Sequence, residues 1–80
     1  MMSNTPHELA EEFPNHVDVM HRLKETDAHF AKLVETYHDV NRAVHRAETR
    51  VEPMDDVGEE SLRRQRMQLK DEIWGYLSAA

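Results

Sequence analysis

The sequence predicts an all-α fold: a coiled-coil-like antiparallel two-helix hairpin with one or two short N-terminal helices. Apolar residues recur at alternating steps of three and four over residues 30–51, which is the heptad pattern of a packed helix. A second apolar stripe follows over residues 62–76, beyond a segment that contains proline and glycine. Two glycines and three prolines in 80 residues leave little material for turns, which suits a few long helices.

The chain is long enough for one domain only. We divide it into an acidic extension, residues 1–13, and a helical hairpin domain, residues 14–80. A domain of this size buries a modest fraction of its surface, and the absence of cysteine excludes disulfides. Small domains of this kind are often stabilised by self-association. We therefore expect the hairpin to oligomerise into a bundle.

Thr5-Pro6-His7-Glu8 has the form of a helix start. Thr5 can act as the cap, Pro6 suits the first helical position, and Glu8 can bond back to the cap. We expect this helix to end near Phe13, because Pro14 disfavours helical geometry in the residue before it.

A second short helix is predicted over residues 15–25, with Asn15 as its cap. The alternative is a single frayed helix with a kink at Pro14. The predicted helix carries one apolar stripe with steps of three, formed by Val17, Met20 and Leu23.

The long helix of the hairpin is predicted over residues 27–51, with Thr26 or Asp27 as its cap. A heptad pattern held over three repeats is the strongest signal in the sequence. The residues of this seam are Phe30, Leu33, Tyr37, Val40, Val44, Ala47 and Val51.

The turn is predicted over residues 52–58, because the ring of Pro53 does not fit a helix interior. Asp56, followed three residues later by Glu59, resembles a capping arrangement that starts the next helix. A turn this short makes the two long helices antiparallel neighbours.

The last helix is predicted over residues 57–78. Arg66 stands at a seam position, where its aliphatic stem can cover the contact while its guanidinium reaches Glu48 or Glu52. The apolar residues of its seam are Leu62, Leu69, Ile73 and Tyr76.

Further apolar residues of the last helix lie off its seam, so the helix is apolar over a wider arc than one neighbour needs. Either the N-terminal helix folds back onto this face or a second copy of the chain covers it, and we expect both to contribute. An exposed tryptophan and methionine on a small domain are typical of an interface. The predicted interface comprises Met67, Trp74, Leu77, Val17 and Met20.

A basic tip is predicted near the turn, amid several acidic residues. The favoured interpretation is ion pairing between the helices, and the alternative is docking of an acidic partner or a nucleic acid. The net charge of −6 disfavours nucleic acid, because phosphate backbones are repelled. The basic tip comprises Arg46, Arg50, Arg63, Arg64 and Arg66. Lys70 and Asp71 are expected to pair with the first arm near Glu35 or Lys32.

Six histidines raise the possibility of a metal or haem site. Two ligands on one helix must stand three or four residues apart, and no two histidines do. His38 and His45 are seven apart and are expected to point outward, so we predict no metal, no cofactor and no catalytic site. Glu35 and His38 match a di-metal motif in spacing but lie off the seam. A histidine-dependent metal or haem site between subunits, or a pH-sensitive assembly, remains an alternative.

The segment Leu62 to Ile73, with its basic run and its Leu-Lys-Asp-Glu-Ile end, resembles the C-terminal signature of the YdcH-like proteins. Upstream, residues of the first arm match that family in order and spacing, so the resemblance covers roughly residues 15–77. It implies a helical hairpin and a cytoplasmic location, and it carries no catalytic residues across. Met67, Gly75 and the acidic extension before Phe13 depart from the family pattern. The matching residues of the first arm are Leu23, Asp27, Phe30, Leu33, Tyr37, Val40 and Glu48.

We therefore expect a cytoplasmic, non-enzymatic helical interaction protein that binds itself and an unidentified protein. Neither a signal peptide nor a membrane span is expected, because no window approaches the roughly 20 apolar residues that a bilayer requires. The alternatives are a small regulator that binds nucleic acid through the basic tip and the histidine-dependent metal or haem binder.

Overall fold

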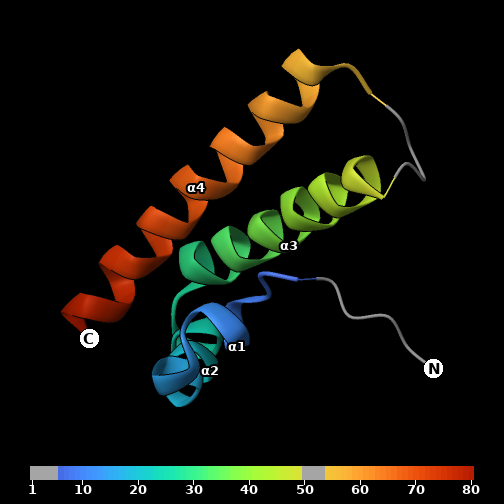
Figure 1. The fold of residues 1–80 in the computed structure, drawn as a ribbon. Coiled ribbons are helices and arrows are strands. Elements are labelled where there is room, and N and C mark those ends of the chain that lie inside the picture. Colours follow the sequence, from blue (N-terminus) through green and yellow to red (C-terminus); the bar gives the residue numbers. More distant parts are fainter. Residues whose placement is uncertain (1–5, 50–53) are drawn as a thin grey trace.

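The computed structural model describes residues 6–49 and 54–80, and within these ranges it contains helices and no strands (Figure 1). The two long helices pack side by side in opposite directions, and the short N-terminal helices lie at the base of this hairpin, away from the turn (Figure 1). The predicted all-α hairpin is therefore confirmed. The elements in chain order are α1 (Leu9–Glu12), the 3-10 turn η1 (Pro14–His16), α2 (Val17–Thr26), α3 (Ala28–Glu48) and α4 (Asp56–Ala79).

Pro14 separates the N-terminal helices as predicted, but the first helix does not start at the predicted cap. α1 begins at Leu9, not at Pro6, because His7 adopts a left-handed conformation with φ of 64°, which no helical residue has. Thr5 lies outside the described residues. Phe13 ends α1 as predicted, and Pro14 opens η1, so the chain forms separate helices instead of one kinked helix. The alternative of a single frayed helix is therefore wrong.

α2 starts later than predicted. Asn15 lies inside η1, and His16 precedes the first residue of α2 without a capping side-chain bond. The helix runs to Thr26, one residue beyond the predicted end. η1 supplies the first turn that an asparagine cap would otherwise start, so the predicted cap at Asn15 is wrong.

α3 has the cap that its sequence predicts. The Asp27 carboxylate accepts a hydrogen bond of 3.1 Å from the Phe30 backbone N–H, which satisfies one donor of the first turn. α3 ends at Glu48, where the Thr49 hydroxyl donates to the carbonyl of His45. The predicted end at residue 51 is therefore wrong, because Thr49 is no longer helical; Val51 itself lies outside the described residues.

α4 is capped by Asp55, so the prediction of Asp56 is wrong by one position. The Asp55 carboxylate accepts a hydrogen bond of 2.8 Å from the Gly58 backbone N–H. A Cβ atom at position 58 would lie only 2.9 Å from that carboxylate oxygen, which explains why glycine suits this position. Pro53, the predicted helix terminator, lies outside the described residues.

The core forms where the predicted seams of α3 and α4 meet. Phe30 and Tyr76 pack edge to face with ring centroids 5.2 Å apart, which joins the start of α3 to the end of α4. Val40, Leu62, Leu69 and Tyr76 are half-buried members of the seam. The buried apolar residues are Leu9, Met20, Phe30, Leu33, Val34, Tyr37, Val44, Ala47, Ile73 and Leu77.

Met20 and Leu77 are part of this core, although both were predicted at a partner interface. Leu77 is only 3% exposed, and Val17 is half-buried against the same cluster. Met20 and Leu77 are therefore not available on the surface of the single chain, whereas Val17 is only partly covered.

Candidate interaction surface

α4 carries a second stripe of residues beside its seam. Its members are separated by steps of four, three, four and three, so they share one side of the helix, one residue round from the seam. Met67 and Trp74 are 64% and 44% exposed, whereas Leu77 at the end is buried. The C-terminal end of the second stripe is therefore part of the core, whereas Met67 and Trp74, nearer the start of α4, are exposed to solvent. Its members are Arg63, Met67, Lys70, Trp74 and Leu77.

The segment of residues 6–16, here called the N-terminal arm, covers part of the second stripe. The Phe13 ring stacks on Trp74 with centroids 5.6 Å apart, and His16 packs edge-on against the same indole at 5.3 Å. The Lys70 ammonium lies 2.5 Å from the Glu12 carboxylate. Lys70 was predicted to pair with α3, and this prediction is wrong because the arm brings a carboxylate closer.

Long-range hydrogen bonds anchor the N-terminal arm to α3. The Tyr37 hydroxyl donates to the His7 carbonyl at 2.6 Å, and the Asn41 amide donates to the Pro6 carbonyl at 2.9 Å. The Asn41 side chain is fully buried. Sequence reasoning missed Asn41, although a polar residue four positions after Tyr37 on the inner side of the helix was a usable signal.

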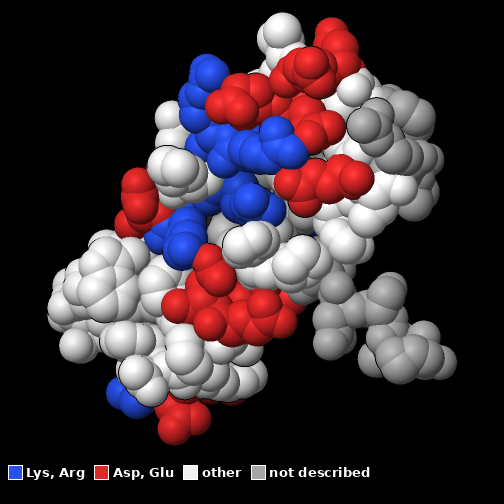
Figure 2. Space-filling model, in the orientation of Figure 1, with Lys and Arg blue, Asp and Glu red and all other residues white. Residues whose placement is uncertain are grey.

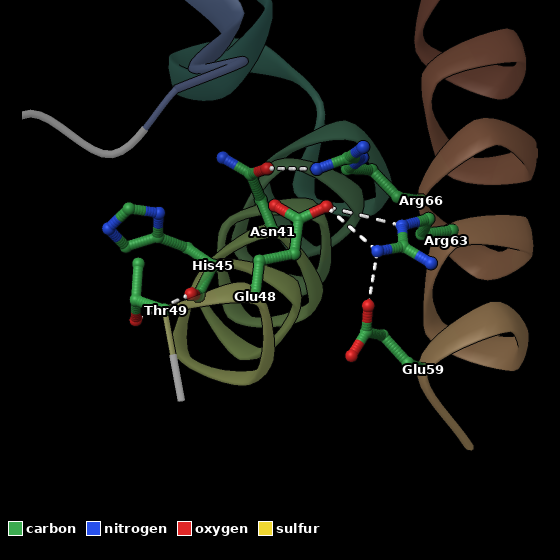
Figure 3. A network of polar contacts seen from close by, with 7 residues as sticks. All are labelled: Asn41, His45, Glu48, Thr49, Glu59, Arg63 and Arg66. Carbon is green, nitrogen blue, oxygen red and sulfur yellow. Dashed lines mark hydrogen bonds and ion pairs between the residues drawn. The ribbon is translucent and has the colours of Figure 1, made fainter. Parts of the chain in front are cut away.

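Asn41 also holds Arg66, as Figure 3 shows. Nη1 of Arg66 donates to Oδ1 of Asn41 at 3.1 Å. Among the described residues Glu48 is bound instead by Arg63, whose guanidinium also contacts Glu59 on its own helix (Figure 3). The predicted pairing of Arg66 with Glu48 is therefore wrong, and the alternative partner Glu52 lies outside the described residues. The seam position of Arg66 is half-buried as expected.

The basic tip contains the predicted ion pair between the helices. Nη2 of Arg63 lies 3.1 Å from the Glu48 carboxylate, and this hydrogen bonding raises the pKa of Arg63. Arg64 approaches Glu60 at 3.9 Å, and Arg46 lies exposed in the last turn of α3. Arg50 lies outside the described residues. Figure 2 shows basic side chains gathered across the middle of one face, with acidic side chains on both sides.

A groove of about 340 Å³ opens between the N-terminal arm, α3 and α4. Burial, followed by the charge of Glu12, raises the pKa of Tyr37 to about 12, so its phenol is a hydrogen-bond donor at neutral pH. The hydrogen bond from Lys70 lowers the pKa of Glu12. Both groups are therefore held in one protonation state around neutrality. The groove is lined by His7, Glu12, Tyr37, Glu60, Arg63, Arg64, Arg66, Met67 and Lys70.

The histidines near the arm contact carboxylates. Nδ1 of His38 lies 2.9 Å from the Glu8 carboxylate, and Nδ1 of His7 lies 3.5 Å from that of Glu12. His38 therefore faces the arm and is half-buried, in contrast to the predicted outward orientation, and His45 is also half-buried. Over residues 6–49 and 54–80, no three histidine or acidic side chains gather closely enough to bind a metal ion together.

The family model "Protein of unknown function (DUF465)" matches residues 30–77, more than half of the chain. The chain belongs to the DUF465 family. This confirms the resemblance to the YdcH-like proteins over residues 30–77. The match is shorter than the predicted span of residues 15–77, so α1, α2 and the residues Leu23 and Asp27 of this DUF465 protein lie outside it. No curated protein and no solved structure matches the chain. In the described part of the chain, no helix has the length and apolar character to span a bilayer.

Proposed function

We propose that this DUF465 protein is a non-enzymatic helical interaction protein that associates with itself and with an unidentified protein partner in the cytoplasm. The observation that carries the proposal is the exposure of Met67 and Trp74 on one side of α4. Tryptophan is enriched among residues that dominate binding energy, and large apolar side chains left open beside each other favour association.

The position of these two side chains supports a helix as the partner. Met67 and Trp74 are seven residues apart, so they lie about 10 Å from each other along the helix axis. Lys70 stands between them, and its ammonium is already paired with Glu12. A second helix laid along this face would therefore bury two large apolar groups without leaving that charge unpaired.

Sedimentation velocity over a range of concentrations tests self-association. We expect the mass of the wild type to rise with concentration and that of Met67→Glu to stay at the monomer value. Gln68→Glu is the matched control, because Gln68 is exposed one residue away on another side of α4, and it should behave like the wild type. A wild type that remains monomeric at every concentration would refute self-association.

Nucleic-acid binding through the basic tip and a histidine-dependent metal or haem site are less well supported by the described residues. Arg63 and Arg64 of the basic tip are occupied by carboxylates of this chain, which weakens the case for nucleic acid. Nδ1 of the half-buried His38 lies 2.9 Å from the Glu8 carboxylate without hydrogen-bond geometry. Absorbance spectra and metal content of the purified protein test the histidine alternative directly.

A further inference from the structure

We infer that two copies of the chain associate through α4 packed antiparallel against α4, in the register that brings Arg64 of each copy beside Asp71 of the other. The inference rests on the proposed self-association and deepens it, because it names the partner helix, its direction and its register. It concerns one exposed side of α4, here called the outer face. The outer face consists of Glu60, Arg64, Met67, Asp71, Trp74 and Ser78.

The outer face has the spacing of a helix-packing seam. Its residues recur at steps of four, three, four, three and four, so they form one line along α4. All of them are exposed in the single chain, whereas most residues at such spacing on α3 are buried in the hairpin. The outer face shares Met67 and Trp74 with the second stripe. α4 therefore offers a second line along which another helix can pack.

The charges of the outer face complement a second copy in one direction only. Arg64 precedes Met67 by three residues and Asp71 follows it by four, so their midpoint lies beside Met67. When two copies of α4 lie antiparallel about a twofold axis at that point, Arg64 of each copy meets Asp71 of the other, and the pair forms twice. A parallel arrangement sets like charges opposite each other at both positions.

Asp71 is a charge that the described part of this chain leaves unpaired. No hydrogen bond or ion pair within residues 6–49 and 54–80 holds its exposed carboxylate, and no residue three or four positions away on α4 is basic. A cation that neutralises Asp71 must therefore come from elsewhere. In the antiparallel pair it comes from the second copy.

Arg64 retains the donors for this contact. Its guanidinium approaches the Glu60 carboxylate at 3.9 Å, and among the described residues none of its N–H groups makes a hydrogen bond. Such an exposed pair is weak. Glu60 also repels Asp71 of the second copy, but it lies one turn further from the axis, opposite Gly75. Arg64 is therefore the charge nearest to the approaching carboxylate.

The apolar residues fit the same register. Met67 is 64% exposed and lies at the axis, where it meets Met67 of the second copy. Trp74 packs beside the aliphatic stem of the second copy's Arg64, which can cover the exposed part of the indole. A Cβ atom at Gly75 would have nothing within 4 Å, so the side chain that crosses it has room. Sliding the copies until Arg64 meets Glu60 would leave Trp74 without a partner.

The test is sedimentation velocity of charge-reversal variants of the full chain. Arg64→Glu sets two carboxylates against each other at both contact points, and Asp71→Arg sets two guanidinium groups against each other. We expect each variant alone to raise the dissociation constant of self-association at least about tenfold. In an equimolar mixture of the two variants, opposite charges meet at both points of the mixed dimer. The mixture should therefore associate about as tightly as the wild type.

Two variants on the exposed side of α3 are the matched controls. Arg42→Glu and Asp39→Arg change the net charge by the same amounts as the test variants, and both residues are exposed. Each control, and their mixture, should associate like the wild type. Circular dichroism of every variant establishes that it is folded, so that a loss of association cannot be attributed to unfolding.

The outcomes separate the register from self-association as such. A wild type that associates while both reversal variants do so equally well would overturn the register and keep the dimer. Variants that lose association without recovery in the mixture would overturn it too. An effect of Arg64→Glu with none of Asp71→Arg would favour the slid register with Glu60 and overturn this one. A wild type that stays monomeric would remove both proposals and leave the outer face to a different protein.

Discussion

The buried amide of Asn41 should be the polar group on which the attachment of the N-terminal arm depends most. It donates to the Pro6 carbonyl at 2.9 Å and accepts from Arg66 at 3.1 Å, so it joins three segments that are distant in sequence. Replacement of Asn41 by alanine removes both hydrogen bonds and leaves two groups without their partner. We expect this single change to destabilise the fold more than most surface substitutions.

The magnitude follows from the surroundings of the three groups. A buried polar group that loses its partner costs about 1–3 kcal/mol, with the higher values for charged groups. Asn41 is fully buried, but Arg66 is half-buried and Pro6 is exposed, so water can replace part of each lost bond. We therefore expect a loss of about 2 kcal/mol, against a total stability of roughly 4–12 kcal/mol for a chain of this length.

Urea unfolding followed by far-ultraviolet circular dichroism measures this loss. With a slope of about 1–3 kcal/mol per molar urea, the midpoint should fall by about 1 M. Asn41→Asp keeps an acceptor for Arg66 and loses the donor to Pro6, so it should cost less than Asn41→Ala. A double-mutant cycle with Arg66→Met should give a coupling energy above about 0.5 kcal/mol. A loss below about 0.5 kcal/mol for Asn41→Ala would refute the reasoning.

Three further predictions concern single groups. Lys70→Met should lower the free energy of unfolding by up to about 1 kcal/mol at neutral pH. The folded chain holds the pKa of Glu12 below its ordinary value of 4.5. Acid unfolding curves of the wild type should therefore show this stabilisation being lost as the pH falls below about 4.5. The Tyr76→Phe variant leaves Tyr37 as the only phenol, which should titrate near pH 12 in ultraviolet absorbance. The contribution of neutral Tyr37 to folding stability should be intact below pH 10 and lost as the pH rises towards 12. Asp27→Ala should cost about 1 kcal/mol in urea unfolding, because it removes the cap of α3.

Each of these predictions has its own control. Equal acid sensitivity of Lys70→Met and the wild type would contradict the role of the ion pair. A phenol that titrates near pH 10 while circular dichroism still shows a folded chain would contradict the burial of Tyr37. Asp39→Ala removes an exposed carboxylate from the middle of α3, and a cost equal to that of Asp27→Ala would show that capping is not the cause.

The candidate site could be predicted only in part. Met67 and Trp74 were recognised because they are large apolar residues away from the seam, and both are exposed in the structure. The interhelical ion pairing was recognised as well, with Arg63 as the residue that makes it. Leu77 was assigned to the partner interface but lies in the core, because the expected folding back of the N-terminal helix could not be assigned to particular residues of α4 from periodicity alone.

The features that could be predicted from the sequence alone depend on interactions between residues that are close in the sequence. The heptad seam from Phe30 onwards and the Asp27 cap involve residues within one or two turns of each other, so spacing alone is sufficient to locate them. The hairpin and the DUF465 membership follow from that pattern and from the signature around Ile73.

Only the tertiary structure decided how the N-terminal arm is used. Asn41, Glu12 and Lys70 acquire their partners across separations of 35 and 58 residues, and no spacing rule connects such positions. The physical reason is that a polar side chain pairs with the nearest group of suitable charge, and distance is set by the packing of all the helices together. The groove exists for the same reason, since three separate segments must meet to form it.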